Sequence, residues 1–245
     1  MCLSLLESKN ILSLKVFRLT IMKKSIVLVA FLCSNMVAFC QTTYGIHIGR
    51  NVSNFSFNKD SLAKLGITNT NLAGLSLAIP IEFRVGKNVT IEAELGFLKK
   101  TFQSAQSILI AGTTSKFDFK NATNYAILPV MVRFNTSGRL LQLYANVGPS
   151  AAYAISSTSK GTQTVGSTTT EVSKDNSLDG TNRLQLGLQG GAGLKLKLGF
   201  VALVFDGRFL TDLKDSNGNF NYQGLKDNAF KTQGWTTSFG FVFGK

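Results

Sequence analysis

The stretch from Arg183 to Gly199, RLQLGLQGGAGLKLKLG, places its side chains on two faces that alternate residue by residue. One face carries Leu184, Leu186, Leu188, Ala192, Leu194, Leu196 and Leu198, and the other carries Gln185, Gly187, Gln189, Gly191, Gly193, Lys195 and Lys197. A period of two is the spacing of a β-strand, because successive side chains of an extended chain point to opposite sides. The stretch therefore predicts a strand with one apolar and one polar face.

The same period continues from Gln41 to the C-terminus, which indicates an all-β chain. We predict eight strands, at residues 43–57, 71–85, 89–102, 121–135, 140–155, 182–198, 201–213 and 232–244, each long enough to cross a membrane when tilted. The connections alternate between long, at 58–70, 103–120, 156–181 and 214–231, and short, at 86–88, 136–139 and 199–200. This alternation is typical of an outer-membrane barrel. The 156–181 connection has almost no large apolar residue and is predicted to be a mobile loop.

Residues that pair across a hairpin must face the same side of the sheet, and the predicted turns meet this condition. Across the 199–200 turn, Leu196 meets Leu203, so that apolar pairs with apolar. Across the first short turn, Glu82 meets Glu92, and two adjacent carboxylates require neighbouring arginines.

Side-chain size decides which face lines the barrel. The interior of an eight-stranded barrel is only just wide enough for side chains, so the polar face, rich in small residues, fits inside. The unbroken apolar face would then cover the outside, where in water it would aggregate. We therefore predict a single eight-stranded antiparallel up-and-down transmembrane β-barrel. The alternative is a soluble ligand-binding barrel, which cell fractionation would reveal.

The polar face predicts a charge network in the lumen, with both signs together. Its members are Glu82, Arg84, Glu92, Glu94, Arg133, Asp206 and Arg208. His47, the one histidine of the chain, also belongs to the polar face and should point into the lumen.

The sequence lacks a strong catalytic motif, a phosphate-binding loop, a zinc-ligand cluster and a dinucleotide fingerprint. The Asp215 to Asn219 stretch superficially resembles a calcium loop, but Phe220 occupies the position of its glycine. We therefore predict no catalytic residue, no metal site and no cofactor.

Residues 22–40 have the three parts of a secretory signal peptide. Lys23 and Lys24 precede an apolar run that is too short to span a bilayer, and small residues surround a cleavage point near Cys40 and Gln41. Lipidation of Cys40 is the alternative, although Phe39 is bulky for that processing. Residues 1–21 are interpreted as an over-extended start, which leaves residues 41–245 as the barrel domain.

All three cysteines lie in residues 1–40, so the domain that follows cannot form a disulfide bond. The chain has a formal net charge of +13, and removal of residues 1–40, with five basic residues and one acidic residue, leaves +9. The basic residues are scattered rather than clustered, which argues against a nucleic-acid partner and favours contact with anionic lipid headgroups.

Three segments resemble the PorT-like family of small outer-membrane β-barrels. They are Tyr44 to Asn54, Tyr125 to Pro129 and Val147 to Pro149. The closing segment, Ser238 to Phe243, is similar to the alternating aromatic strand that the barrel-assembly machinery recognises. The resemblance implies a membrane barrel and, for some members, a link to protein secretion, and it implies no particular reaction.

These observations predict a small, non-enzymatic outer-membrane protein that acts through its extracellular loops or within an envelope or secretion complex. Outer-membrane lipid, the barrel-assembly machinery and envelope proteins are the expected partners. The alternatives are a narrow pore and a lipid-modifying enzyme with His47 at the rim. Pro80, Pro129 and Pro149 lie inside predicted strands, where we expect bulges or local breaks.

Overall fold

The computed structural model describes residues 42–56, 67–110, 113–176, 178, 183–213, 216–217 and 229–244. The predicted over-extended start and signal peptide lie outside these ranges. The strands are β1 (Thr42–Ser56), β2 (Ile67–Arg84), β3 (Val89–Ile110), β4 (Thr113–Asn135), β5 (Leu141–Val165), β6 (Thr168–Asn176), β7 (Leu184–Leu198), β8 (Val201–Asp212), β9 (Ser216–Asn217) and β10 (Ala229–Phe243). Among the described residues, no helix has the length and hydropathy needed to cross a membrane.

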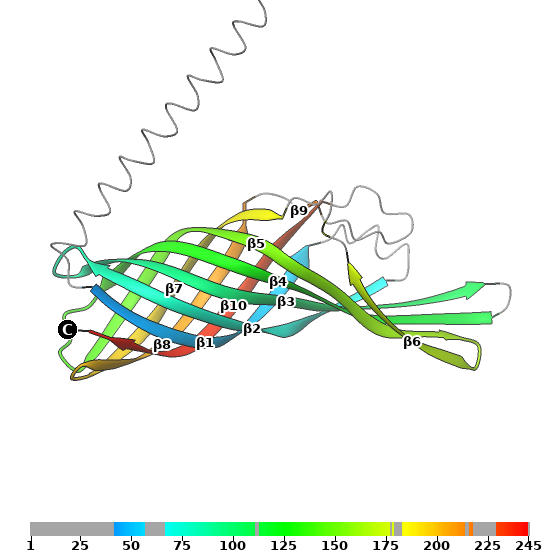
Figure 1. Cartoon of the computed structure of the whole chain (residues 1–245), viewed down its shortest axis with the longest axis horizontal. Helices are drawn as coiled ribbons and strands as arrows, with labels where there is room; N and C mark the ends of the chain where they lie inside the picture. Colours follow the sequence, from blue (N-terminus) through cyan, green and yellow to red (C-terminus); the bar gives the residue numbers. More distant parts are fainter. Residues whose placement is uncertain are drawn as a thin grey trace, which may run out of the picture. The chain divides into compact units, whose positions relative to one another are not determined.

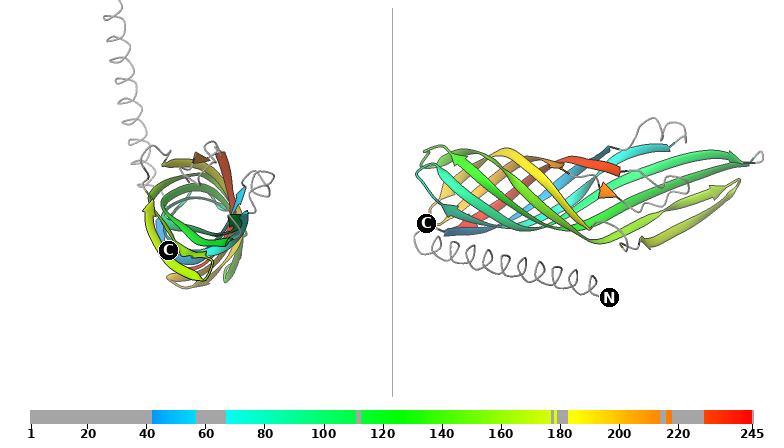
Figure 2. Two further views of the ribbon diagram at one scale, coloured as in Figure 1. Left: turned by 90° about the vertical axis from the view of Figure 1, so that its right-hand side faces the viewer. Right: turned by 90° about the horizontal axis from the view of Figure 1, so that it is seen from above.

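Eight strands close into a ring, which confirms the predicted fold class. The order is β1-β2-β3-β4-β5-β7-β8-β10, and β10 pairs with β1 to complete the ring. Every pairing is antiparallel. Figure 2 shows the closed barrel seen along its axis. The two remaining described strands, β6 and β9, pair with β5 and β10 outside the ring.

The pairing register fixes the stagger of the barrel. Successive paired residues lead around the ring from Thr42 to Val52, ten positions further along β1. They are Thr42, Phe83, Ile91, Val132, Val147, Gly190, Phe209, Trp235 and Val52. A stagger of this size in eight strands requires a tilt of roughly 40° to the barrel axis and leaves an interior that side chains can fill.

The two faces lie as the side-chain sizes predict. Along β7 the leucines at 184, 186 and 188 are exposed on the outside, whereas Gln185 and Gln189 are buried in the lumen. The predicted pairs also form, because Leu196 lies opposite Leu203 and Glu82 lies opposite Glu92.

Two of the predicted long loops are wrong in part, because β3, β4 and β5 continue well beyond the barrel (Figure 1). The 103–120 connection is mostly a hairpin of β3 and β4, and the 156–181 connection contains the end of β5 and all of β6 rather than a mobile loop. In the 156–176 part, Ser and Thr predominate, and the backbone ladder between β5 and β6 holds them with few large apolar side chains. The predicted loops 58–70 and 214–231 lie mostly outside the described residues.

The prolines interrupt the ladder locally, as expected, and the bulges lie elsewhere. Pairing is missing on one side of Pro80, Pro129 and Pro149, while the register is the same before and after each gap. The register shifts instead between Leu72 and Ser76 and beside Asn124.

The short turns, the start of β1 and the end of β10 share one end of the barrel, and the long hairpins leave from the other (Figure 1). In outer-membrane barrels the short turns are periplasmic and the long connections are extracellular. We use these two names for the two ends.

Candidate functional site

Charged side chains from five strands meet in the middle of the lumen. Glu82 comes from β2, Glu92 and Glu94 from β3, and Arg133 from β4, while Lys195 lies on β7 and Asp206 and Arg208 lie on β8. Each projects inward because it alternates with an outward apolar neighbour. All seven are buried, and we call them the central cluster.

Arg133 forms one half of the central cluster. Its guanidinium is fully buried, donates to Glu82 over 2.5 Å and forms an ion pair with Glu92. It also lies 4.0 Å from the ring centroid of Tyr144, in cation–π geometry. The ammonium of Lys195 donates to both oxygens of Glu82, over 2.8 and 2.6 Å. Glu82 is therefore held by two cations.

Arg208 forms the other half. It donates to the two oxygens of Glu94 over 2.6 and 2.8 Å, a bidentate arrangement that is strong and geometrically specific. It also donates to Glu92 over 3.2 Å and to Asp206 over 2.5 Å. The hydroxyl of Tyr144 donates to Asp206 over 2.6 Å, which links the two halves.

Six of the seven predicted network residues lie in this cluster, and Arg84 does not. Arg84 ends β2 at the periplasmic end, where its side chain is exposed and donates to the backbone carbonyl of Lys87. The prediction missed Lys195 and Tyr144. Lys195 was already on the polar face of the 183–199 stretch, and only its reach toward Glu82 could not be read from the sequence.

His47 lies in the lumen, inside the barrel rather than on its rim. Its side chain is buried, and its Nδ1 is 3.5 Å from a carboxylate oxygen of Glu94. Within the described residues, Nε2 has no hydrogen-bond partner. A methyl group added at Gly240 would lie 2.1 Å from the imidazole, so glycine at this position makes room for the ring.

A second polar layer closes the lumen nearer the extracellular end. The buried ammonium of Lys100 pairs with Asp212 at 3.3 Å and donates to Gln185 over 3.2 Å. It also lies 5.0 Å from the ring centroid of Tyr125. We call these four residues the upper layer.

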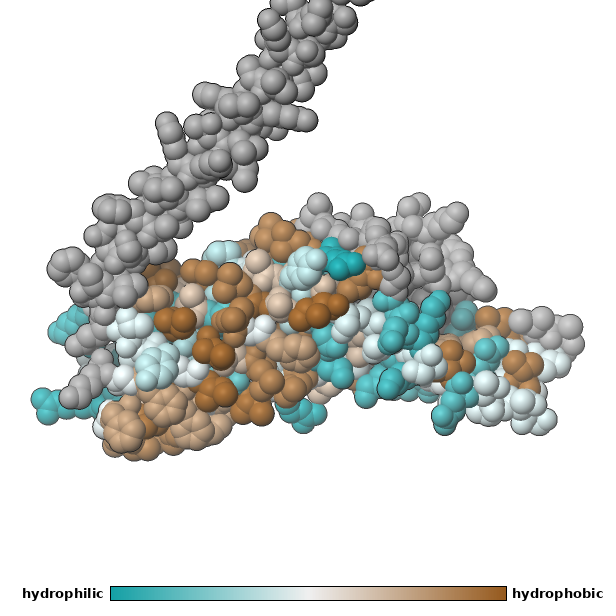
Figure 3. Space-filling model, in the orientation of Figure 1, coloured by the Kyte–Doolittle hydropathy of each residue, from teal (hydrophilic) through white to brown (hydrophobic). Residues whose placement is uncertain are grey.

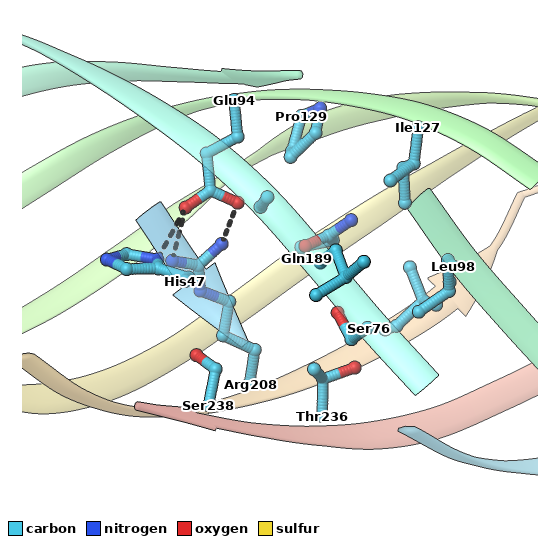
Figure 4. A pocket seen from close by; sticks show the side chains of 13 residues that line it. His47, Ser76, Glu94, Leu98, Ile127, Pro129, Gln189, Arg208, Thr236 and Ser238 are labelled. Carbon is cyan, nitrogen blue, oxygen red and sulfur yellow. Dashed lines mark hydrogen bonds and ion pairs between the residues drawn. The ribbon is translucent and has the colours of Figure 1, made fainter. Parts of the chain in front are cut away.

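A cavity of about 40 Å³ lies between the two layers, because its lining extends from Glu94 and Arg208 of the central cluster to Leu98 and Leu210, each two positions before a residue of the upper layer. Figure 4 shows the residues that line it. Its polar wall includes His47, Glu94 and Arg208, and its apolar wall includes Leu98 and Ile127. The space suits a few water molecules, whereas drug-sized ligands need roughly 300 Å³ or more. In the described part of the chain, no group of three or more His, Cys, Asp and Glu side chains is placed to hold a metal ion.

The central cluster can hold charge in a fixed arrangement. Its carboxylates bond to arginine or lysine, and a buried, hydrogen-bonded ion pair is strongly destabilised when one partner is removed. Among the described residues, His47 contacts the carboxylate of Glu94 through Nδ1, and no hydroxyl is hydrogen-bonded to its Nε2. The arrangement is that of a polar core that fills a barrel.

The outer wall is the reverse of the lumen. Large apolar side chains cover the barrel, and polar side chains predominate where the hairpins project beyond it (Figure 3). A closed barrel with an apolar exterior and a polar, filled interior defines a small outer-membrane β-barrel protein. The sequence agrees, since the family described as "outer membrane protein beta-barrel domain" matches residues 39–218. The chain belongs to this family, and the outer membrane is its location.

Several solved structures are similar in fold. The crystal structure of OprG from Pseudomonas aeruginosa is 14% identical, with 83% of this chain and 96% of that chain covered and a TM-score of 0.46. Neisserial surface protein A is 10% identical, with coverage of 82% and 97% and a TM-score of 0.43. The outer-membrane protease OmpT from Escherichia coli is 8% identical, with coverage of 84% and 97% and a TM-score of 0.32. A search of curated protein sequences gave no significant match.

Proposed function

We propose that this protein is a non-enzymatic outer-membrane barrel, closed to solutes, that binds an envelope or external partner through its projecting hairpins. The observation that carries the proposal is the sheet that these hairpins form. The outer parts of β3 and β4 pair with each other, β4 pairs with β5 as far as Val165, and β5 pairs with β6. We call the part formed by residues 103–110, 113–120, 157–165 and 168–176 the outer sheet.

The outer sheet differs from a set of loops, because its ladder holds every strand against a neighbour. Binding residues on a rigid element keep their positions better than residues on a loop. Exposed Lys116, Lys120 and Lys160 share its outward face with Asp118 and Glu171, so both signs are available to a protein partner.

The filled lumen supports a closed barrel over the narrow pore. The central cluster and the upper layer lie one after the other along the lumen, and Glu92, Arg133 and Lys100 are all nearly inaccessible to solvent. A conducting pore needs a continuous water path, which these side chains block. The position of His47 between the two layers likewise supports a structural role over a lipid-modifying rim enzyme.

The proposal also includes the export of the chain, its insertion into the membrane and the kind of complex that it joins. Residues 22–40 act as a signal peptide that is cleaved near Cys40 and Gln41, and the barrel-assembly machinery inserts the domain that follows. The PorT-like resemblance of the segments at Tyr44, Tyr125 and Val147 favours an envelope or secretion complex as the partner.

Site-specific photo-crosslinking in intact cells tests the partner. A photoreactive residue at position 116, on the outer sheet, should give a discrete adduct, and one at position 87, in a periplasmic turn, should not give that adduct. Residues 158–175 can be replaced with an Asn-Gly turn, because Ser157 and Asn176 are directly paired. This deletion removes the β5 and β6 part of the outer sheet and should abolish the adduct at position 116. Heat-modifiable migration on gels shows that the shortened barrel folds. An adduct that survives the deletion contradicts the proposal.

A further inference from the structure

Arg50 is a charged side chain on the membrane-facing side of the barrel. Along β1 the outward positions are Tyr44, Ile46, Ile48, Arg50 and Val52, and all five are exposed. Among the described strand residues, it is the only charged one with exposed large apolar side chains at the outward positions on both sides of it. An exposed arginine in an apolar band requires an explanation.

The neighbouring strands leave Arg50 without a protein anion. It is paired directly with Leu75 on β2 and with Thr237 on β10, and both partners are exposed. Trp235 stands at the diagonal position, 61% exposed, with its ring packed against Phe209 at 5.1 Å. No ion pair joins Arg50 to a carboxylate among the described residues. Hydrocarbon alone would make this position unfavourable, since a charged side chain on the lipid face is destabilising at the midplane and less so toward the interface.

The position of Arg50 along the barrel axis indicates what its partner is. Arg50 follows three outward apolar positions from the periplasmic end of β1 and precedes only Val52 before the polar Asn54. It therefore lies toward the extracellular end of the band, beside a tryptophan of the kind that marks the interface. Lys99 is outward on β3, next but one to β1, and its backbone packs against Gly74 of the strand between them. The outer surface of β3 turns polar at Lys99, with Gln103 further out.

We infer that Arg50 binds the phosphate group of an outer-leaflet lipid, with the hydroxyl of Thr237 and the ammonium of Lys99 beside it. A guanidinium matches phosphate in a bidentate manner, and its bonds to an anion are stronger where water is scarce. The side chain of Ile48, two positions nearer the periplasmic end of β1, then contacts the acyl chain, and the exposed ring of Trp235, opposite Val52, lies beside the phosphate at the interface.

A lipid suits this surface better than a protein does. The outward neighbours of Arg50 are aliphatic, aromatic or hydroxyl-bearing, and an acyl chain can follow such a surface without further polar contacts. The site is separate from the outer sheet, so it does not depend on the partner proposed there.

Native mass spectrometry of the full-length protein tests the inference. The protein is released from detergent after incubation with diphosphorylated lipid A or with its dephosphorylated form. The wild type should retain the phosphorylated lipid roughly tenfold better, the factor that one charge-assisted contact supplies. R50Q should lose this preference and R50K should keep part of it. R139Q, which removes an exposed arginine from a periplasmic turn, should behave as the wild type.

Three results would overturn the inference. The wild type could retain both lipids equally, or R50Q could keep the full preference for the phosphorylated lipid. R50Q could instead convert a dimer into a monomer with unchanged lipid retention, which would identify the partner of Arg50 as a second copy of the chain. Heat-modifiable migration on gels verifies that each variant is folded.

Discussion

At the scale of single residues, the lumen depends on which long side chains reach one another. The alternation of faces was enough to place Glu82, Glu92, Glu94, Arg133, Asp206 and Arg208 in the lumen. It could not exclude Arg84, because the same alternation holds at the strand end, where the side chain reaches solvent instead. It could not show that Lys195 reaches Glu82 from β7, since that contact depends on the stagger of the closed barrel.

Replacing Arg133 with leucine should destabilise the barrel strongly. The change leaves Glu92 and Glu82 buried with less positive charge, and removal of one partner of a buried ion pair costs about 3–5 kcal/mol. The free energy of unfolding measures the effect. It is obtained by titrating the protein in lipid vesicles with urea and determining the folded fraction from gel migration. Arg84→Leu is the matched control and should cost less than about 1 kcal/mol, because Arg84 is exposed. Equal losses in the two variants would show that burial does not set the energy of these pairs.

Replacing Gly240 with alanine should also destabilise the barrel, through crowding. The added methyl group would lie 2.1 Å from the His47 ring and 2.4 Å from the carbonyl oxygen of Ile46, and relieving such contacts costs about 1–3 kcal/mol. Gly207→Ala is the control, since its nearest neighbour would be 3.8 Å away. The same unfolding measurement should show Gly207→Ala unchanged or slightly stabilised. A tolerated Gly240→Ala would mean that His47 can move aside.

At the scale of elements, the sequence predicted the strands inside the membrane better than their extensions. Within the barrel wall an apolar side chain faces lipid at nearly every second position, so the period is clear. Residues 103–120 and 156–176 carry many Ser, Thr, Gln and Lys side chains, and the period disappears from the hydropathy although the backbone ladder continues. The hydropathy of such polar segments therefore predicts loops.

The turn at Gly199 and Phe200 provides a test at this scale. Gly199 has a φ of +81°, which a first turn residue in a two-residue hairpin of type II′ requires and which side chains other than glycine rarely adopt. Gly199→Ala should lower the free energy of unfolding by about 1 kcal/mol or more and slow the closing of the β7–β8 hairpin. Gly86→Ala, in another short turn, has no positive φ and should have little effect. Refolding into vesicles, timed by gel migration, compares the two variants, and equal refolding rates would contradict the argument.

At the scale of the whole molecule, closure of the ring brings together residues that are far apart in the sequence. Arg208 and Glu94 are 114 positions apart, and they meet because β8 and β3 lie on facing sides of one narrow lumen. The strand count and a filled lumen could be predicted, because they follow from pattern and size. The ten-residue stagger and the division of the lumen into two layers could not, because they depend on the register of all eight pairings at once.

The two layers act in series, so opening one of them should not open the lumen. Serine at Glu82, Glu92, Arg133 and Lys195 removes equal numbers of positive and negative charges from the central cluster, while the upper layer still blocks the path. Serine at Lys100 and Asp212 opens the upper layer alone. In planar bilayers the wild type and both variants should show no conductance steps, and the combined variant should conduct. A cysteine at Ser238, which lines the cavity between the layers, should react with a charged thiol reagent from outside once the upper layer is opened. Conductance by the wild type would favour the narrow pore, and conductance by the upper-layer variant alone would show that the central cluster does not close the barrel.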